Sequence, residues 1–395
     1  MRIAFFTETY PPYINGVATQ TKMLKDTYEL LGHEVLVVTV GSEKQKEKIL
    51  KDGVLYLPGI ELKKIYNYRI SMPVSPSHLE EVVYFDPDII HAQNEFGVGL
   101  SGRKFAKKYN IPLVYTLHSE YDRFLFYVGL KDGNPLFEKI SKKLSDQFLK
   151  KLPESADIIT SPSYKAQAYL DRQKIDKKVY VIENTIDNSK FLPSPKKDQF
   201  RKDFREKYKL SDSTKALVFV GRIGKEKNIE ELVESFIYAN VDADKAKLFI
   251  IGKGPDLESI TEMIKEKNLE DKIICLGPVD NTDIPLYLSA MDYYTTASLS
   301  EMHSISMLEG MASGLPALIK LDVPNESQIR KGLNGYTWED KEDFKNLLDK
   351  VLNFSAEEEA KLKETTLAYI ENNNNIKQAE TLLALYEKAI NKKNN

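Results

Sequence analysis

The stretch MRIAFFTETYPPYINGVATQTKMLKDTYELLGHEVLVVT, residues 1–39, decides the fold. Its apolar residues form a short run at 3–6, recur at helical spacing over 17–31, and form a second run at 35–39. Gly32 stands where the helical spacing stops, as glycine commonly does at a helix end. Strand, helix and strand in this order predict a βαβ unit with two parallel strands.

The same alternation continues along the chain. Further strands are predicted at 89–90, 113–116, 158–159 and 179–182 and, after a polar stretch at 187–198 interpreted as a linker, at 216–220, 248–251, 273–276, 293–296 and 317–319. A chain of 395 residues is long enough for two domains. We therefore expect an α/β protein with two doubly wound Rossmann-like domains, at 1–187 and 188–372. A C-terminal helix over 373–395 follows, with packing back on the N-terminal domain as a hypothesis.

Composition limits the classes of function. Apolar residues make up 42% of the chain, charged residues 29%, and the formal net charge is -3, which gives no reason to expect nucleic acid as a partner. The single cysteine, Cys275, can form no intramolecular disulfide, which favours a reducing compartment. The first apolar run is too short for a signal peptide, and no run approaches the roughly 20 apolar residues of a membrane span. We expect a cytoplasmic protein that meets a membrane only from its inner surface.

Ligands of open α/β sheets bind beyond the carboxyl ends of the strands, so polar residues and glycines that follow a strand are the candidate binding groups. Asn15 and Gly16 follow the first predicted strand and open the first helix, where backbone amides favour an anion. An Asn-Gly pair is also a common turn. The glycine spacing of a dinucleotide-binding loop does not occur here, which argues against a nicotinamide oxidoreductase.

The second predicted domain carries the stronger signals. Arg222 and Lys227 follow its first strand, where a guanidinium and an ammonium could neutralise a diphosphate. The stretch SEMHSISMLEGMASGLP, residues 300–316, places Glu301 before a predicted helix and Glu309 about two turns inside it. Glu309 could accept hydrogen bonds from both hydroxyls of a ribose, Glu301 would lie beside a sugar, and the helix amides would face the diphosphate. By spacing alone, two solvated glutamates are an equal alternative.

This set, with the helix ending MASGLP, resembles the retaining family-four glycosyltransferases of GT-B fold, and the resemblance covers nearly the whole chain. It implies two Rossmann-like domains facing across a cleft. It also implies that Gly16 borders the donor phosphate, that His118 contacts the transferring sugar, and that Arg222 and Lys227 hold the diphosphate.

The resemblance further implies that Glu301 binds the sugar hydroxyls, with His303 and Ser304 beside it, and that Glu309 binds the ribose. His118, Glu301, Arg222 and Lys227 form the expected catalytic set. No side chain in this set is an obvious nucleophile, so we expect a front-face mechanism in which the leaving phosphate accepts the acceptor's proton. Two Asp-x-Asp strings, at 86–88 and 242–244, are interpreted as turns, and neither a metal nor a cofactor is expected.

Three N-terminal phrases, YRIS at 68–71, PDIIH at 87–91 and AKKYNIP at 106–112, resemble the bacterial diacylglycerol glucosyltransferases more than the family at large. They imply transfer of a hexose, with glucose the first choice, from a UDP-sugar to diacylglycerol or another lipid. His91-Ala-Gln93 and Asn184-Thr185 depart from the family pattern and bear on the acceptor, and His303-Ser304 leaves the donor hexose open. An already glycosylated lipid, a polysaccharide or a soluble acceptor remains an alternative, as does a non-enzymatic nucleotide-binding scaffold. The oligomeric state stays open.

With the diacylglycerol resemblance, an amphipathic helix predicted at 135–152 implies a membrane contact. Its apolar stripe is flanked by lysines and preceded by the apolar run 124–130. The residues assigned to acceptor or anionic membrane contact are Tyr13, Tyr121, Phe124, Phe126, Lys142, Lys143, Lys150 and Lys151. The alternative is an ordinary core-facing helix with a solvated lysine face.

Overall fold

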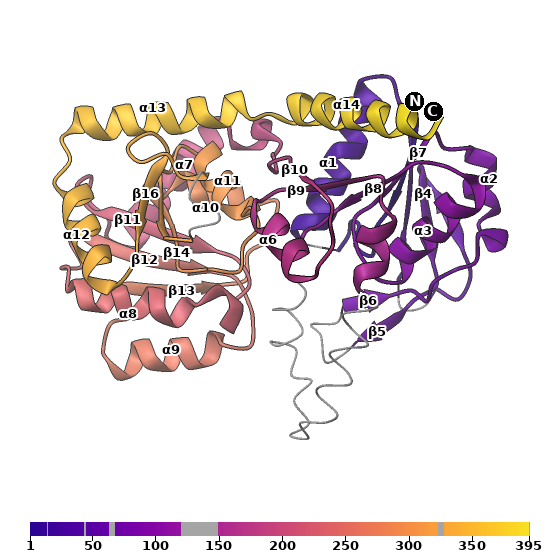
Figure 1. Ribbon diagram of the computed structural model, residues 1–395. Coiled ribbons are helices and arrows are strands. Elements are labelled where there is room, and N and C mark those ends of the chain that lie inside the picture. Colours follow the sequence, from indigo (N-terminus) through magenta and orange to yellow (C-terminus); the bar gives the residue numbers. More distant parts are fainter. Residues whose placement is uncertain (14, 43–44, 63–67, 120–148, 323–327, 395) are drawn as a thin grey trace. The chain divides into compact units, whose positions relative to one another are not determined.

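The computed structural model describes residues 1–13, 15–42, 45–62, 68–119, 149–322 and 328–394 (Figure 1). The chain divides into two compact units. The first consists of Met1–Thr185 and Asn375–Asn395, and the second of Ile186–Asn374. The boundaries expected from the sequence, 187 and 372, each differ from these by two residues.

The first unit is built on a mostly parallel sheet. Its strands are β1 (Arg2–Phe6), β2 (Glu34–Val40), β3 (Ile49–Lys51), β4 (Val54–Leu57), β7 (Ile89–Ala92), β8 (Leu113–Thr116), β9 (Ile158–Ser161) and β10 (Val179–Val181). Within the described ranges the strand order is β10-β9-β8-β7-β1-β2-β4-β3, and only β3 pairs antiparallel. A separate antiparallel pair consists of β5 (Ile60–Leu62) and β6 (Tyr68–Ile70). The sequence pattern missed β3 to β6, which are short.

Helices cover both faces of this sheet. They are α1 (Gly16–Leu30), α2 (Glu80–Phe85), α3 (Gly97–Tyr109), α6 (Lys165–Arg172), α14 (Asn375–Asn394) and the 3-10 turn η1 (Pro76–His78). Ile3 and Phe5 of β1 pack in one core with α1 and α14. Phe6, whose side chain points to the other face, lies so close to α3 that a Cβ on Gly102 would meet its ring.

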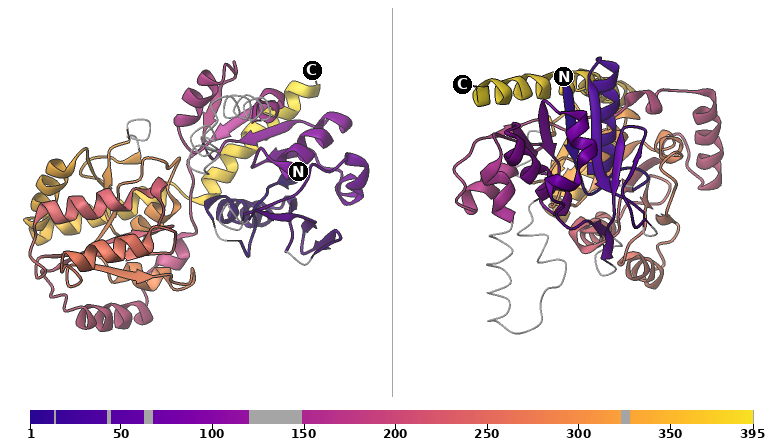
Figure 2. Two further views of the ribbon diagram at one scale, coloured as in Figure 1. Left: turned by 90° about the horizontal axis from the view of Figure 1, so that it is seen from below. Right: turned by 90° about the vertical axis from the view of Figure 1, so that its right-hand side faces the viewer.

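The C-terminal helix α14 belongs to the first unit, and it packs beside α1 (Figures 1 and 2). Gln378 accepts a hydrogen bond from Gln20 Nε2 at 2.7 Å. The Tyr386 hydroxyl lies 2.5 Å from Nδ1 of the fully buried His91, whose Nε2 lies 2.6 Å from the Thr116 hydroxyl. His91 therefore has a structural role, because it ties α14 to the centre of the sheet.

The second unit is a parallel doubly wound sheet. Its strands are β11 (Lys215–Val220), β12 (Ala246–Ile251), β13 (Ile273–Gly277), β14 (Tyr293–Thr296), β15 (Ala317–Lys320) and β16 (Gly335–Trp338). Among the residues with assigned positions the order is β13-β12-β11-β14-β15-β16, all parallel. The predicted strands at 216–220, 248–251, 273–276, 293–296 and 317–319 are confirmed, and β16 was missed.

Two layers of helices enclose this sheet. The helices are η2 (Asn188–Phe191), α7 (Pro195–Lys207), η3 (Lys225–Lys227), α8 (Ile229–Ala239), α9 (Leu257–Glu266), α10 (Ile284–Ser289), α11 (Ile305–Ala312), α12 (Lys341–Leu352) and α13 (Ala356–Asn372). α8, α9 and α12 pack on one face, and α7, α10 and α11 on the other (Figure 1). The linker predicted at 187–198 is wrong, because those residues form η2 and the start of α7.

Asp86 and Asp88 lie at the amino end of β7, where both carboxylates pair with Arg2 of the neighbouring β1, at 2.8 and 3.3 Å. Arg2 also donates its backbone N–H to Asp88 at 2.6 Å. This pairing fastens the amino ends of two adjacent strands, at the edge of the sheet opposite to the one where ligands of such folds bind.

Candidate active site

Each unit has a topological switch point, where strands on either side were added in opposite directions. In the second unit it lies between β11 and β14, which are paired neighbours. In the first unit it lies between β1 and β7. The candidate residues follow these strands, so each unit gathers its own set at the carboxyl edge of its sheet.

In the second unit, the segments after β11 and β14 are joined by charged side chains. Lys227, in the turn η3, forms an ion pair with Glu301 from the loop after β14. Arg222 pairs with Glu226, also in η3. Ser300 Oγ donates to the Glu226 carbonyl at 2.8 Å, which fixes the two loops to each other. The structure therefore brings Lys227 to Glu301, with Arg222 on the same loop as Lys227.

Two glycines allow the loop after β12 to pack closely against the backbone on either side of Arg222. The loop after β12 contains Gly252 and Gly254, and a Cβ on either would clash with the carbonyl of Gly221 or Ile223. Gly252 also has φ +148°, which residues with side chains rarely adopt. These glycines thus set the position of the loop that carries Arg222.

The helix α11 begins four residues after Glu301, later than the sequence suggested. Ser304 is its N-cap, and its side chain accepts the Met307 N–H at 3.3 Å. Ser304 thus has a capping role in the positions described. His303, 4% exposed, precedes it, and burial lowers its pKa to about 4, so the ring is neutral at physiological pH.

Glu309 lies in the second turn of α11, rather than about two turns after its start. Burial raises its pKa to about 7, and the nearby Lys190 opposes this rise. Glu309 and Glu301 both act electrostatically on the Tyr294 phenol of β14. Lys190 was missed because it stands in the stretch interpreted as a linker, whereas it belongs to η2, which packs against α11.

In the first unit, Gly16 starts α1 and is exposed. Asn15 is the N-cap, with its side chain accepting the Ala18 N–H at 2.8 Å. Tyr13 lies in the preceding turn, where its N–H donates to the Tyr10 carbonyl at 3.0 Å. The free amides of the first helical turn therefore point to the carboxyl edge of the sheet, which suits an anion.

His118 lies two residues beyond β8, near the same edge. Its Nε2 is 2.6 Å from Oε1 of Gln93, which follows β7. Burial lowers the pKa of His118 to about 4, so its imidazole is neutral at physiological pH. A neutral imidazole can offer one N–H and one acceptor nitrogen to its surroundings.

Glu8 is a buried carboxyl that the sequence interpretation missed. It follows β1, is 2% exposed, and its Oε1 accepts the Val98 N–H at the start of α3 at 2.8 Å. Burial raises its pKa to about 8 in spite of that hydrogen bond. A charged residue directly after the first strand was the signal that could have identified it.

The expected membrane contact is only partly described. Tyr121, Phe124, Phe126, Lys142 and Lys143 lie outside the described residues.

Residues 149–155 are helical, and this described helix ends three residues beyond the predicted end at 152. Leu149 and Leu152 are buried, Lys150 is partly buried and Lys151 is exposed. Over 149–155 the helix therefore packs its leucines in the core, as in the alternative of a core-facing helix with a solvated lysine face.

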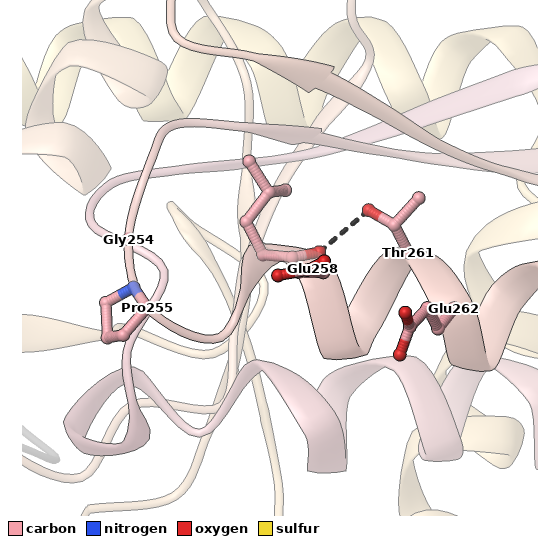
Figure 3. Close-up of a pocket in the computed structure, with 6 residues that line it drawn as sticks. Gly254, Pro255, Glu258, Thr261 and Glu262 are labelled. Atoms are coloured by element: carbon pink, nitrogen blue, oxygen red, sulfur yellow. Dashed lines mark hydrogen bonds between the residues drawn. The ribbon is translucent and has the colours of Figure 1, made fainter.

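A shallow depression of about 420 Å³ lies beside α9 (Figure 3). Gly254 and Pro255 border it, and Glu258, Thr261 and Glu262 line it from the helix. The two carboxylates would repel a diphosphate, which disfavours donor binding in this depression.

Within the described ranges, no group of three His, Cys, Asp or Glu side chains is placed to hold a metal ion. Among the helices with assigned positions, none combines the length and apolar character needed to cross a bilayer.

Comparison with known proteins shows the family of the chain. Residues 14–190 match the family described as Glycosyltransferase Family 4, and residues 200–368 match Glycosyl transferases group 1. The chain is 30% identical to the alpha-monoglucosyldiacylglycerol synthase of Acholeplasma laidlawii, over 85% of this chain and 84% of the relative. It is also 30% identical to the enzyme of that name from Streptococcus pneumoniae, over 80% of this chain and 70% of the relative.

Solved structures share the fold. Anabaena HepE in complex with UDP matches with a TM-score of 0.73 at 15% identity, covering 98% of this chain and 100% of that one. Sucrose-phosphate synthase from Thermosynechococcus elongatus matches with a TM-score of 0.75 at 16% identity, covering 98% of each chain. With the two parallel-sheet units, these similarities show that the chain is a glycosyltransferase of GT-B fold and belongs to family four.

Proposed function

We propose that this enzyme transfers glucose from UDP-glucose to 1,2-diacylglycerol with retention of the α configuration, without a metal ion. The observation that carries the proposal is the cluster of Arg222, Lys227 and Glu301 at the switch point of the second unit, with Glu309 on the adjoining helix. Anabaena HepE, which shares the fold, binds UDP-glucose. The two relatives at 30% identity are named for α-glucosyl transfer to diacylglycerol.

The cations account for binding and departure of the diphosphate. Lys227 and Arg222 are partly exposed, with 21% and 34% of their side chains accessible, so a ligand can reach them. A diphosphate would compete with Glu301 for Lys227 and with Glu226 for Arg222. Exchange of Lys227 from Glu301 to the diphosphate frees the Glu301 carboxylate to accept hydrogen bonds from sugar hydroxyls.

The same groups stabilise the transition state. As the bond between the anomeric carbon and the diphosphate oxygen breaks, negative charge grows on the leaving oxygens. Arg222, Lys227 and the first amides of α11 would stabilise that charge, so side chains and backbone dipoles would supply what a metal ion supplies elsewhere.

The acceptor hydroxyl enters from the face that the diphosphate leaves. Its oxygen forms the new bond to the anomeric carbon, and its proton passes to a leaving phosphate oxygen. His118 contacts the transferring sugar during this step as a neutral imidazole. Because glucose is α-linked in UDP-glucose, an α-linked product means retention.

The peripheral membrane role rests on the lipid acceptor. Lys151 is exposed, and together with Lys142, Lys143 and Lys150 it would contact an anionic bilayer on the cytoplasmic face. Replacement of all four lysines by glutamine should weaken sedimentation with vesicles that contain anionic lipid. Unchanged binding and activity would argue against this contact.

The function is tested with radiolabelled UDP-glucose and diacylglycerol in mixed micelles, in the presence of a chelator. A chelator-resistant α-linked glucolipid is the expected product, and Glu309→Ala should abolish it. Glu262→Ala, an exposed carboxylate on α9, is the matched control and should leave the rate unchanged. A β-linked product would refute retention, and chelator sensitivity would refute metal independence.

Absence of any glucolipid would refute the donor and acceptor together. A panel of other nucleotide sugars, including GDP-mannose, would then be assayed with glycosylated lipids and soluble glycans. The GDP-mannose-dependent α-mannosyltransferase of Mycolicibacterium smegmatis, 23% identical over 80% of this chain, is the reason to include that donor.

A further inference from the structure

The proposed function assigns no role to Gln93, whose side chain contacts His118. Both side chains stand just after neighbouring strands, β8 and β7, and His118 Nε2 lies 2.6 Å from Gln93 Oε1. An amide oxygen can only accept, so in this arrangement Nε2 of the imidazole carries the proton and donates it. The other nitrogen, Nδ1, is then an acceptor.

Hydrogen bonds fix the backbone at Gln93 and next to His118. The Gln93 N–H donates to the Phe6 carbonyl of β1 at 2.8 Å, and Gln93 is 2% exposed. Next to His118, the Leu117 N–H donates to the Thr160 carbonyl at 2.9 Å, and its own carbonyl accepts the Ser161 hydroxyl at 3.0 Å. Because both backbones are fixed, the side-chain contact determines the orientation of the imidazole ring.

Burying the Gln93 amide is energetically unfavourable if the side chain only fills space. Its amide nitrogen is buried and has no hydrogen-bond partner among the described residues. A buried donor without a partner costs about 1–3 kcal/mol, and an apolar side chain of similar size would avoid that cost. The contact with His118 gives a reason for an amide at this position.

We propose that Gln93 is the positioning residue of His118: it keeps the imidazole proton on Nε2 and presents Nδ1 as the hydrogen-bond acceptor for a hydroxyl of the transferring sugar. This inference rests on the proposed function, because it gives His118 a sugar to contact. It makes His118 a group that selects sugars carrying a hydroxyl donor at the contacted position.

His91 on β7 does not determine which nitrogen of His118 carries the proton. His91 lies two residues before Gln93, and both of its ring nitrogens are engaged, with Tyr386 and Thr116. Burial lowers the pKa of His91 to about 3, with a smaller contribution from His118, so it is neutral as well. Neither ring carries charge at physiological pH, and the position of the proton on His118 is set by the hydrogen bond with Gln93.

The first test measures the tautomer directly. Two-dimensional ¹H–¹⁵N NMR of histidine-labelled protein distinguishes the two neutral tautomers, and the His118→Asn spectrum assigns the His118 signals. We expect the Nε2–H form in the wild type and a mixture of both forms in Gln93→Met, which has the length of glutamine but no acceptor. An Nδ1–H form in the wild type, or an unchanged tautomer in Gln93→Met, would overturn the proposal.

The second test is kinetic. Gln93→Met should lower kcat at least roughly tenfold while KM for UDP-glucose changes little, because the misplaced ring affects the transition state more than ground-state binding. Gln93→Glu keeps an acceptor oxygen and should restore most of kcat at pH 8. Its negative charge should raise the pKa of His118, so activity should fall below about pH 6, where the ring becomes charged.

The matched control is Gln20→Met. Gln20 is also buried, at 3% exposure, but it binds Gln378 rather than His118, so kcat should be unchanged. Thermal unfolding of each variant shows whether it folds. Wild-type kcat in Gln93→Met would refute the positioning role.

The two hypotheses fail in different experiments. If the wild type made no glucolipid, the proposed function would fail. The NMR result would still decide whether Gln93 sets the His118 tautomer.

Discussion

Glu309 should make donor binding depend on pH. Burial raises its pKa to about 7. The ionised carboxylate offers one acceptor oxygen to each ribose hydroxyl, whereas protonation turns one of these oxygens into a donor and weakens the contact. With a pKa of about 7, the ionised fraction rises from about 0.1 at pH 6 to about 0.9 at pH 8. The Kd for UDP-glucose should therefore fall about tenfold over this range, a change of about 1.4 kcal/mol in binding free energy.

Isothermal titration calorimetry measures this effect cleanly with UDP-glucose, because its diphosphate diester does not titrate between about pH 6 and 8. The buried histidines His91, His118 and His303 stay neutral there, since their pKa values are about 3, 4 and 4. At pH 7, binding should release about half a proton, seen as a binding enthalpy that varies with the buffer.

Glu309→Gln removes the titrating group while keeping the shape of the side chain. Its Kd at pH 8 should be about tenfold weaker than that of the wild type, and should no longer vary with pH. Glu262→Gln, on the exposed side of α9, should retain the wild-type slope. A wild-type Kd that stays constant from pH 6 to 8, or a slope that survives in Glu309→Gln, would refute the assignment of Glu309 to the ribose.

Three other variants test separate parts of the structure. Glu8 keeps its proton in the folded state up to about pH 8 but releases it near pH 4.5 when unfolded, so stability falls as pH rises between these values. The unfolding free energy of the wild type, measured in urea, should fall by up to about 4 kcal/mol more between pH 5 and 9 than that of Glu8→Gln. An equal pH dependence in the two proteins would contradict this prediction. Tyr386→Phe leaves His91 Nδ1 without its partner and should lower the unfolding free energy by about 1–3 kcal/mol, whereas an unchanged urea midpoint would show that the bond does not anchor α14. Lys227→Met should raise KM for UDP-glucose at least roughly tenfold and weaken its salt dependence, and unchanged kinetics would remove Lys227 from the donor site.

The sequence determined the fold because the pattern of apolar residues is local. Parallel strands buried on both faces read as continuous apolar runs, and β8 (Leu113–Thr116) and β14 (Tyr293–Thr296) begin and end at the predicted residues. Short strands such as the edge strand β3 and its neighbour β4 carry little pattern and were missed. The stretch at 187–198 looked like a linker because its proline and serine also suit a helix start: Ser194 caps α7, and Pro195 is its first residue.

For the candidate site, too, some residues could be selected from the sequence and others could not. Position after a strand pointed to Arg222 and Lys227, because strand ends of a doubly wound sheet converge on one edge. The choice of Glu301 and His118 depended on the family resemblance as well. Their partners could not be selected, since Gln93 is 25 positions from His118 in sequence, and Glu301 is 74 positions from Lys227.

Protonation was decided by the tertiary structure alone. Glu309 and Glu301 are the same residue type, as are Glu8 and the exposed Glu262, and nothing in a local sequence says which carboxyl will be desolvated. Burial raises the pKa of Glu309 to about 7 and that of Glu8 to about 8, because the folded chain removes water from around them and returns few hydrogen bonds. The sequence by itself determined the fold and named most of the chemical groups. Only packing between distant segments decided which of them are charged, how they are oriented and what each one contacts.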